Sequence, residues 1–225
     1  VPLAVSNIWV HEAAGNALNN VKIAFGQSKE KFSVQGRLLF THVGLSGPMI
    51  LNSARQVKEM LRGGPVKTQI NLFPDTDQSD LDGKFLTHCS EHQNKNIFNT
   101  LRLFLSTYLC LPVLRQAGLN EDQQQGQINS MTKDQRSALI QVMQGLECKV
   151  TGLVTKKAVV SDGGLPLDEV DMRTCQSKKT NNLYVTGDLL HINRPSGGYS
   201  LQLCWTTGYI AGLSAAEAIE GWSRW

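Results

Sequence analysis

The sequence predicts a mixed α/β (α+β) protein, because three stretches of different character follow one another along its 225 residues. The first 40 residues contain short runs of β-forming residues separated by Gly, Asn and Ser, which favour turns. Residues 79–145 are mostly helical in the spacing of their apolar side chains. The chain then returns to β-type runs and closes with a helix over about residues 198–219. Its length fits one large or two small domains.

The first third of the chain is predicted to be a meander of strands followed by a helix. The expected strands are the runs PLAVSNIWV, NNVKIAF and RLLF. In THVGLSGPMILNSARQVKEMLRGG, Pro48 suits the first turn of a helix, apolar residues recur as far as Leu61, and Gly63 and Gly64 end the pattern. We therefore expect a strand, a tight turn and a helix in this segment.

Later segments alternate between the two patterns. KTQINLF alternates like a strand, whereas NIFNTLRLFLSTYLCLPVL and TKDQRSALIQVMQGL have helical spacing. CKVTGLVT, KAVVSDGG and NLYVTGD are predicted to be strands. The Leu, Ala and Gly residues of the closing helix would let it lie close against a sheet.

Composition narrows the class of protein. The net charge is +3, from 22 basic and 19 acidic residues without a basic block, so we expect no nucleic acid partner. The five cysteines form no C-x-x-C pair and no zinc-like pattern with histidine, which indicates reduced thiols, a cytoplasmic protein and no metal site. No apolar run approaches the roughly 20 residues that span a bilayer, so we expect a soluble protein without a membrane partner.

The sequence opens on VPLAV, without an initiator Met and without the basic and apolar regions of a signal peptide. We therefore expect it to be part of a longer polypeptide.

Residues 181–212, NNLYVTGDLLHINRPSGGYSLQLCWTTGYIAG, have the pattern of half a binding site. Asp188 follows the predicted strand 183–185, and the carboxyl ends of strands are where open α/β sheets bind ligands. Gly197 and Gly198 allow the backbone to approach a ligand, and the helix that follows presents N–H groups and a positive dipole end to it. An equally good interpretation is that Gly197 and Gly198 form an ordinary turn, and that the small residues of the helix serve only its packing.

The same stretch, extended back to KAVVSDGG, resembles the C-terminal portion of the aminoacetone-oxidase-like family of NAD(P)/FAD-dependent flavoproteins. LLFTHVGLSGPMIL and VPLAV are similar to further segments of that family, so the resemblance covers essentially the whole chain. It implies an FAD-binding domain built from two halves of the sequence, with a domain inserted between them. Residues 1–145 would be the inserted β-meander and helical substrate (cap) domain, and residues 146–225 the second half of the two-part FAD-binding domain.

The resemblance also implies cofactor-binding positions. Gly187 and Asp188 would approach the ribityl or phosphate region of FAD. The isoalloxazine ring would be lined by the start of the closing helix, namely Gly197, Gly198, Tyr199, Ser200, Leu201 and Gln202. A neighbouring turn would be formed by Ser161, Gly163 and Gly164.

This sequence departs from the family pattern at several of these positions. Asp188 stands where the family has Glu, His191 where it has Asp, and Ser200 where it has Asn, so the substrate cannot be taken from the family. A G-x-G-x-x-G fingerprint, which would hold the pyrophosphate, is absent from the 225 residues. We therefore expect this chain alone to bind FAD weakly or not at all. NAD(P)H is a candidate partner in electron transfer.

No catalytic residue is assigned. His42, Ser46 and His191 are candidates for the substrate side, but a histidine beside a turn is more often structural, and His191 stands in a predicted loop. The Gly44–Pro48 turn is a second candidate anion site, for which a structural role is favoured.

The function expected from the resemblance is that of a fragment of an FAD-dependent oxidoreductase acting on a small organic substrate. One alternative is a non-enzymatic interaction or scaffold domain derived from such a flavoprotein. Another is one chain of a split flavoenzyme, whose missing N-terminal FAD-binding half is a separate chain. An uncovered sheet edge would also favour oligomers.

Overall fold

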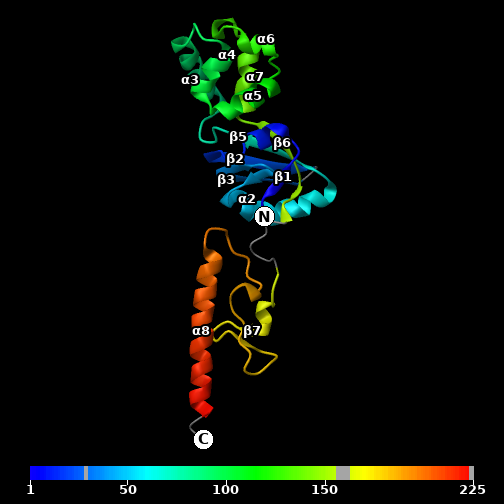
Figure 1. The fold of residues 1–225 in the computed structure, drawn as a ribbon, viewed down its shortest axis with the longest axis vertical. Coiled ribbons are helices and arrows are strands. Elements are labelled where there is room, and N and C mark those ends of the chain that lie inside the picture. The colour runs from blue at the N-terminus through cyan, green and yellow to red at the C-terminus, as the bar shows by residue number, and fades with distance from the viewer. Residues whose placement is uncertain (28–29, 156–162, 223–225) are drawn as a thin grey trace. The chain divides into compact units, whose positions relative to one another are not determined.

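A computed structural model describes residues 1–27, 30–155 and 163–222, and the chain divides into two units, Val1–Lys157 and Ala158–Trp225 (Figure 1). The first unit contains a β-barrel and a group of helices. The second contains a long helix and a largely irregular segment beside it.

Six antiparallel strands form the closed barrel of the first unit, in the order β1-β4-β3-β2-β5-β6. Along β5 every second side chain is buried, which is the pattern of a strand with one face toward a core. The barrel core includes Ile23, Phe25, Phe40 and Ile70. The strands are β1 Leu3–Val5, β2 Ala17–Gln27, β3 Glu30–Thr41, β4 Gly44–Ser46, β5 Val66–Asn71 and β6 Leu146–Leu153.

The predicted N-terminal meander is confirmed for β2 and β3, which pair along most of their length, for example Ile23 with Val34. The run PLAVSNIWV was predicted as one strand, and this prediction is wrong beyond Val5. The residues Ile8–Glu12 form a short helix, α1, whose Val10 is buried in the core. The break occurs at Asn7, whose side-chain Oδ1 accepts a hydrogen bond of 2.8 Å from the Lys149 N–H of β6.

The predicted strand, tight turn and helix are confirmed by β4 and by α2, Pro48–Met60, which continues as the 3₁₀ helix η1, Leu61–Gly63. Gly44 and Gly47 have φ values of +147° and +106°, in the region that favours glycine. A Cβ on Gly44 would clash with the Leu3 carbonyl oxygen of β1, and one on Gly47 would lie 2.8 Å from the Arg37 carbonyl oxygen of β3. The two glycines therefore let three strands lie close together where the chain turns.

The predicted helical region is also confirmed, and it fills the sequence between β5 and β6. Four of these helices begin at a residue whose side chain accepts a hydrogen bond from a backbone N–H of the first turn, which explains where they start. The capping residues are Asp77, Asn96, Asn120 and Thr132. The helices lie together next to β5 and β6 (Figure 1). They are α3 Gln78–Glu91, α4 Ile97–Phe104, α5 Thr107–Gln116, α6 Glu121–Gln125, η2 Ile128–Ser130 and α7 Lys133–Met143.

The expected division at residues 145 and 146 falls inside this first unit. Strand β6 pairs with both β5 and β1, for example Val66 with Val150 and Leu3 with Leu153. Residues 146–153 are therefore the strand that closes the barrel, and the two units divide after Lys157.

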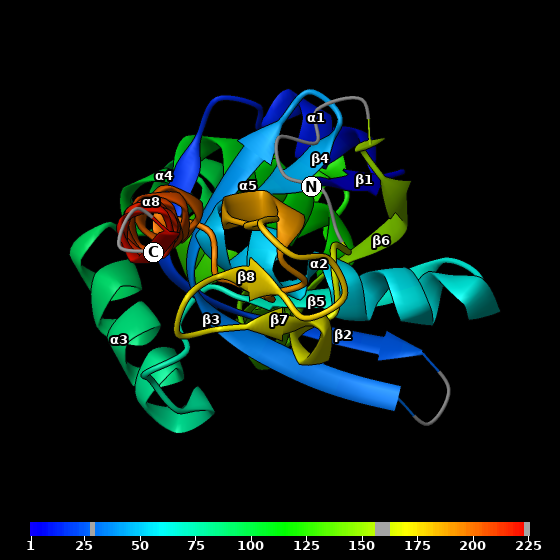
Figure 2. The same ribbon diagram turned by 90° about the horizontal axis from the view of Figure 1, so that it is seen from below.

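In the second unit, β7 (Val170–Asp171) and β8 (Gln176–Ser177) form a small two-stranded ribbon (Figure 2). A small core contains Val170, Val185 and Leu190. The strand predicted over 183–185 is wrong, because Tyr184 makes only an isolated bridge to Gln176. KAVVSDGG lies mostly outside the described residues. Two 3₁₀ helices, η4 Leu167–Glu169 and η5 Gly187–Leu189, complete this segment.

The predicted closing helix is confirmed as α8, Tyr199–Trp222. It contacts η5 (Figure 1), but much of its apolar surface is exposed. The exposed fractions of Trp205, Tyr209 and Ile219 are 66%, 73% and 70%. Among the described residues of this unit, no sheet covers these side chains. A search of the described helices found none long and apolar enough to cross a membrane.

Candidate functional site

The N-terminus of α8 is open to a ligand. Gly197 and Gly198 precede the helix with φ values of +105° and +97°, and no atom beyond their immediate chain neighbours lies within 4 Å of where their Cβ atoms would be. The backbone N–H groups of the first turn have no partner inside a helix, and together they carry a partial positive charge. This end of α8 therefore suits an anionic or electron-rich group that approaches close to the backbone.

Arg194 organises the side chains around this helix end. Its guanidinium donates to the Asp188 carboxylate, to Ser200 Oγ at 2.7 Å and to the Ile192 carbonyl oxygen at 2.7 Å. The Arg194 side chain is 10% exposed, whereas that of Asp188 is 41% exposed. Arg194 therefore balances the charge of Asp188, and the carboxylate keeps accessible lone pairs that can accept hydrogen bonds from hydroxyl groups.

Gly187 attaches the Asp188 loop to α8. Its N–H donates a hydrogen bond of 2.9 Å to Thr207 Oγ1, and its φ is +60°. A Cβ on this residue would lie 2.7 Å from Cys204 Sγ. Asp188 is thus held at a defined height along α8 by the residue before it.

The turn at Gly163 and Gly164 lies against the same loop. The Leu165 N–H donates to the Leu189 carbonyl oxygen at 2.7 Å, and the His191 N–H donates to the Leu165 carbonyl oxygen at 2.9 Å. A Cβ on Gly164, whose φ is +127°, would lie 2.7 Å from the Leu189 carbonyl oxygen. This turn is therefore close to the 187–191 segment, as expected for neighbouring parts of one site.

The second unit thus brings together several of the sequence-predicted residues. Tyr199 and Leu201 are each 57% exposed, and Gln202 donates to Thr206 Oγ1 at 3.1 Å, so these three project from the first turn of α8 rather than into a core. His191 is exposed as well. Ser161 lies outside the described residues.

His42 and Ser46 belong to the other unit. His42 is exposed in the turn between β3 and β4, and Ser46 pairs with Leu39 in the barrel register. Both residues therefore lie at the β3–β4 end of the barrel unit.

Sequence reasoning missed Arg194 and Thr207. A lone arginine between Asp188 and the Gly-Gly pair was the available signal for Arg194, because a cation near a carboxylate in a loop often orients it. Thr207 stands among small helix residues, and its sequence position carries no comparable signal.

The cysteines of the barrel unit have the properties of inert thiols. Burial raises the pKa of the Cys110 thiol to about 11 and that of the Cys148 thiol to about 12. A thiol that stays protonated is a poor nucleophile and a poor metal ligand. A different group of described side chains has suitable metal ligands, namely His88, Glu91 and His92.

Comparison with known proteins identifies relatives of most of this chain. A family model described as the HI0933-like protein barrel and H2TH domain matches residues 1–160. The 3-dehydro-bile acid delta(4,6)-reductase of Clostridium scindens is 30% identical over 190 residues, which are 81% of this chain and 44% of that protein.

Two ribosomal RNA dihydrouridine synthases are also similar. The Escherichia coli protein is 32% identical over 173 residues, covering 76% of this chain and 40% of that protein. The Haemophilus influenzae protein is 23% identical over 187 residues, covering 82% of this chain and 43% of that protein. The chain therefore spans less than half the length of these relatives, and the matches confirm the resemblance inferred from its motifs.

Proposed function

The chain belongs to the HI0933-like family, and on this premise we propose that it supplies the barrel domain and one side of the flavin site of an FAD-dependent oxidoreductase. The barrel unit would act as the substrate (cap) domain, and the unit that contains α8 as the second half of the FAD-binding domain. Both roles rest on the family resemblance together with the geometry of the α8 end.

The observation that carries the proposal is the set of groups around the start of α8. Gly197 and Gly198 leave space beside the backbone, the helix end favours negative charge, and Asp188 is held in place by Arg194 with accessible oxygens. These groups fit FAD, whose ring carries negative charge when reduced and whose ribityl chain carries hydroxyls. Bound FAD would supply hydride transfer, which no side chain can perform.

Each part of the site has a distinct task in this proposal. The α8 N-terminus would stabilise negative charge on the ring, and Asp188 would accept hydrogen bonds from the ribityl hydroxyls. Gly163 and Gly164, with Ser161 outside the described residues, would form the neighbouring wall. Arg194 would orient Asp188 and Ser200 without contacting the reacting atoms.

The exposed face of α8 supports the proposal that another segment completes the site. Trp205, Tyr209 and Leu213 are between 50% and 73% exposed, which is unusual for large apolar side chains so close together. We propose that the first half of the FAD-binding domain covers this face, as part of the same gene product or as a separate chain. The chain alone would then bind FAD weakly.

The three relatives carry two names, a delta(4,6)-reductase and a dihydrouridine synthase, and each name denotes the addition of hydrogen to a ring double bond. We propose the same class of reaction, with NAD(P)H as a candidate reductant. The relatives differ in substrate: one is named for a bile acid and two for ribosomal RNA. The expectation of a small organic substrate is supported by the first name, while the expectation of no nucleic acid partner is not supported by the other two.

The test is FAD binding, measured by quenching of flavin fluorescence, for this chain and for the complete gene product. We expect tight binding only by the complete product. Asp188→Asn should weaken its binding about tenfold, equivalent to about 1.4 kcal/mol. Asp168→Asn, in the exposed part of the same unit, is the matched control and should leave the affinity unchanged.

If the complete gene product binds no FAD after reconstitution, the proposal is wrong and a scaffold role remains. With FAD bound, turnover of a 3-dehydro-bile acid or of a uridine-containing rRNA fragment would identify the substrate class.

A further inference from the structure

The end of α3 carries three side chains with the chemistry of a metal site, far in sequence from the proposed flavin site. We propose that His88, Glu91 and His92 bind one divalent transition-metal ion of the class that prefers imidazole ligands, such as Zn²⁺. The inference does not depend on the proposed function, because the three residues belong to the helical part of the barrel unit.

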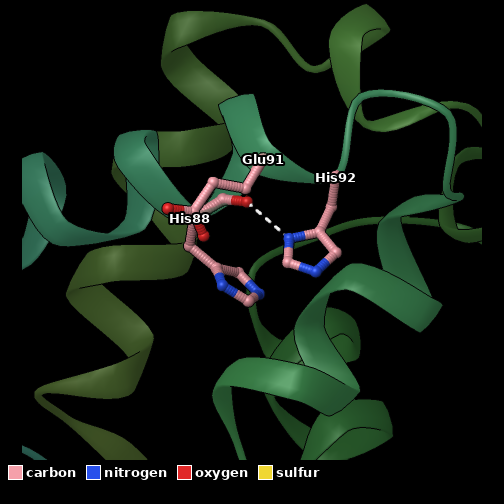
Figure 3. A group of neighbouring side chains, drawn as sticks. All are labelled: His88, Glu91 and His92. Atoms are coloured by element: carbon pink, nitrogen blue, oxygen red, sulfur yellow. Dashed lines mark hydrogen bonds between the residues drawn. The ribbon is translucent and has the colours of Figure 1, made fainter.

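The spacing places all three ligands on one side of the helix end. Residues three and four positions apart are neighbours on a helix surface, so His88 lies beside both Glu91 and His92 (Figure 3). One potential ligand atom from each of the three side chains lies within 4.8 Å of the other two. Ligand atoms that share one tetrahedral Zn²⁺ ion at about 2 Å lie roughly 3–4 Å apart, so the side chains have only a short distance to close.

Both imidazoles are oriented by backbone carbonyl groups. His88 Nε2 lies 3.0 Å from the Thr100 carbonyl oxygen of α4, and His92 Nδ1 lies 2.9 Å from the His88 carbonyl oxygen (Figure 3). A carbonyl oxygen only accepts hydrogen bonds, so each of these nitrogens carries the proton. The other nitrogen of each ring, Nδ1 of His88 and Nε2 of His92, therefore has a free lone pair.

This arrangement is the one that metal-binding histidines use. A histidine ligand usually donates its second ring N–H to a carbonyl or carboxylate, which holds the tautomer and the ring orientation. Here two adjacent histidines have that partner before any ion is bound. Their rings are 4.6 Å apart between centroids, and Phe104 packs 5.3 Å from the His88 ring. The rings are thus held together by packing as well as by hydrogen bonds.

The local charge also favours a cation. Helix α3 ends at Glu91, and the C-terminal end of a helix carries partial negative charge. The Glu91 carboxylate adds a full charge at the same end. His88 and His92 are half-buried, whereas Glu91 is exposed, so an ion would have three protein ligands and positions left for water.

The bound ion would fix the end of α3, where His88 already contacts α4. His88 is connected to α4 through Thr100, and His92 is the residue that follows α3. An ion that holds both histidines and Glu91 would therefore fasten the end of α3 and the turn that leads to α4. Its effect would be to stabilise the helical part of the barrel unit.

The test uses the whole chain, stripped of metal by a chelator and titrated with Zn²⁺ in a calorimeter. We expect one ion per chain and an increase in the thermal unfolding temperature on binding. Glu91→Gln and His92→Gln should each weaken Zn²⁺ binding by more than about tenfold. His42→Gln, which changes an exposed histidine elsewhere in the same unit, should bind Zn²⁺ like the wild type.

Co²⁺ provides an independent readout, because its visible absorption is strong when it is bound by four or five ligands that include histidine nitrogens and weak when it is free in water. The absorption should be present in the wild type and in His42→Gln and lost in His92→Gln. Circular dichroism of each variant checks that its helices are intact. The proposal is overturned if the wild type binds no Zn²⁺, or if folded Glu91→Gln and His92→Gln bind it as tightly as His42→Gln does.

Discussion

The Gly187 N–H donates a 2.9 Å hydrogen bond to Thr207 Oγ1, which joins the loop that carries Asp188 to the middle of α8. Thr207 is 4% exposed, and its hydroxyl also donates to the Leu203 carbonyl oxygen at 2.6 Å. A single buried hydroxyl thus sets the position of the Asp188 loop along the helix.

Thr207→Val should loosen this loop. The substitution keeps the shape of the side chain but leaves the buried Gly187 N–H without an acceptor, at a cost of about 1–3 kcal/mol. Hydrogen exchange of the amides in 187–191 should become faster accordingly. Thr206→Val changes the neighbouring, exposed threonine and should have little effect. Equal exchange in both variants would show that the hydrogen bond does not hold the loop.

Two glycine substitutions in the barrel unit should have opposite effects on stability. Gly44→Ala places a Cβ against the Leu3 carbonyl oxygen at a φ of +147°, and should destabilise the unit by more than about 2 kcal/mol. Gly83 lies within α3 with no atom within 4 Å of a Cβ, so Gly83→Ala should stabilise it by up to about 1 kcal/mol. Thermal unfolding followed by circular dichroism compares the two, and a change of the same sign in both would contradict the prediction.

The buried thiol of Cys148 should make stability fall at alkaline pH. Burial raises its pKa from 9.0 to about 12, so above pH 9 the unfolded chain releases a proton that the folded chain retains. Stability is therefore fully present below pH 9 and decreases as the pH rises toward 12, by up to about 1.4 kcal/mol per pH unit for this one group. In urea unfolding between pH 8 and 11, the free energy of unfolding should fall less steeply with pH for Cys148→Ala than for the wild type.

The free energy of unfolding of Cys148→Ala at pH 8 provides the control. Its difference from the wild-type value at this pH measures the cost of the lost side chain before the thiol titrates. Parallel curves for the two proteins above pH 9 would show that Cys148 does not contribute to the decline.

Arg194→Gln should release the start of α8. The Arg194 side chain is almost buried and donates to three groups, so its loss leaves Asp188 and Ser200 without their shared partner. We expect the first hydrogen-bonded amides of α8, residues 202–206, to exchange about tenfold faster, equivalent to about 1.4 kcal/mol of local stability. Arg173→Gln is the control, because it removes an arginine that is 90% exposed and pairs with Asp171. It should leave the exchange of the amides around Asp171 unchanged. Unchanged exchange in Arg194→Gln would mean that α8 begins without help from Arg194.

Elements whose signals are local could be predicted well. Helix α2 begins at Pro48, and Gly63 and Gly64 end the helical segment as predicted. Helices α3, α4 and α7, in the predicted helical region, begin where a polar side chain caps the backbone, whereas α6 formed in a stretch that reads as a polar loop. The strand predicted over 183–185 failed for the opposite reason. A run such as Leu-Tyr-Val becomes a strand only where it pairs over several residues with a partner strand. In the described part of this unit its pairing with β8 is limited to an isolated bridge between Tyr184 and Gln176.

The sequence by itself determined that a strand region comes first and a helical region follows it, and it also determined the glycine turns, the family resemblance and the Gly-Gly start of α8. Each of these features depends on residues close together in the chain. Tertiary structure decided that β1 and β6, which pair Leu3 with Leu153, close a barrel. It also decided that Arg194 meets Asp188 and Ser200, and that the His88 ring meets Thr100. Strand register and the approach of side chains from different elements depend on how the whole chain packs, and no short sequence pattern encodes that packing.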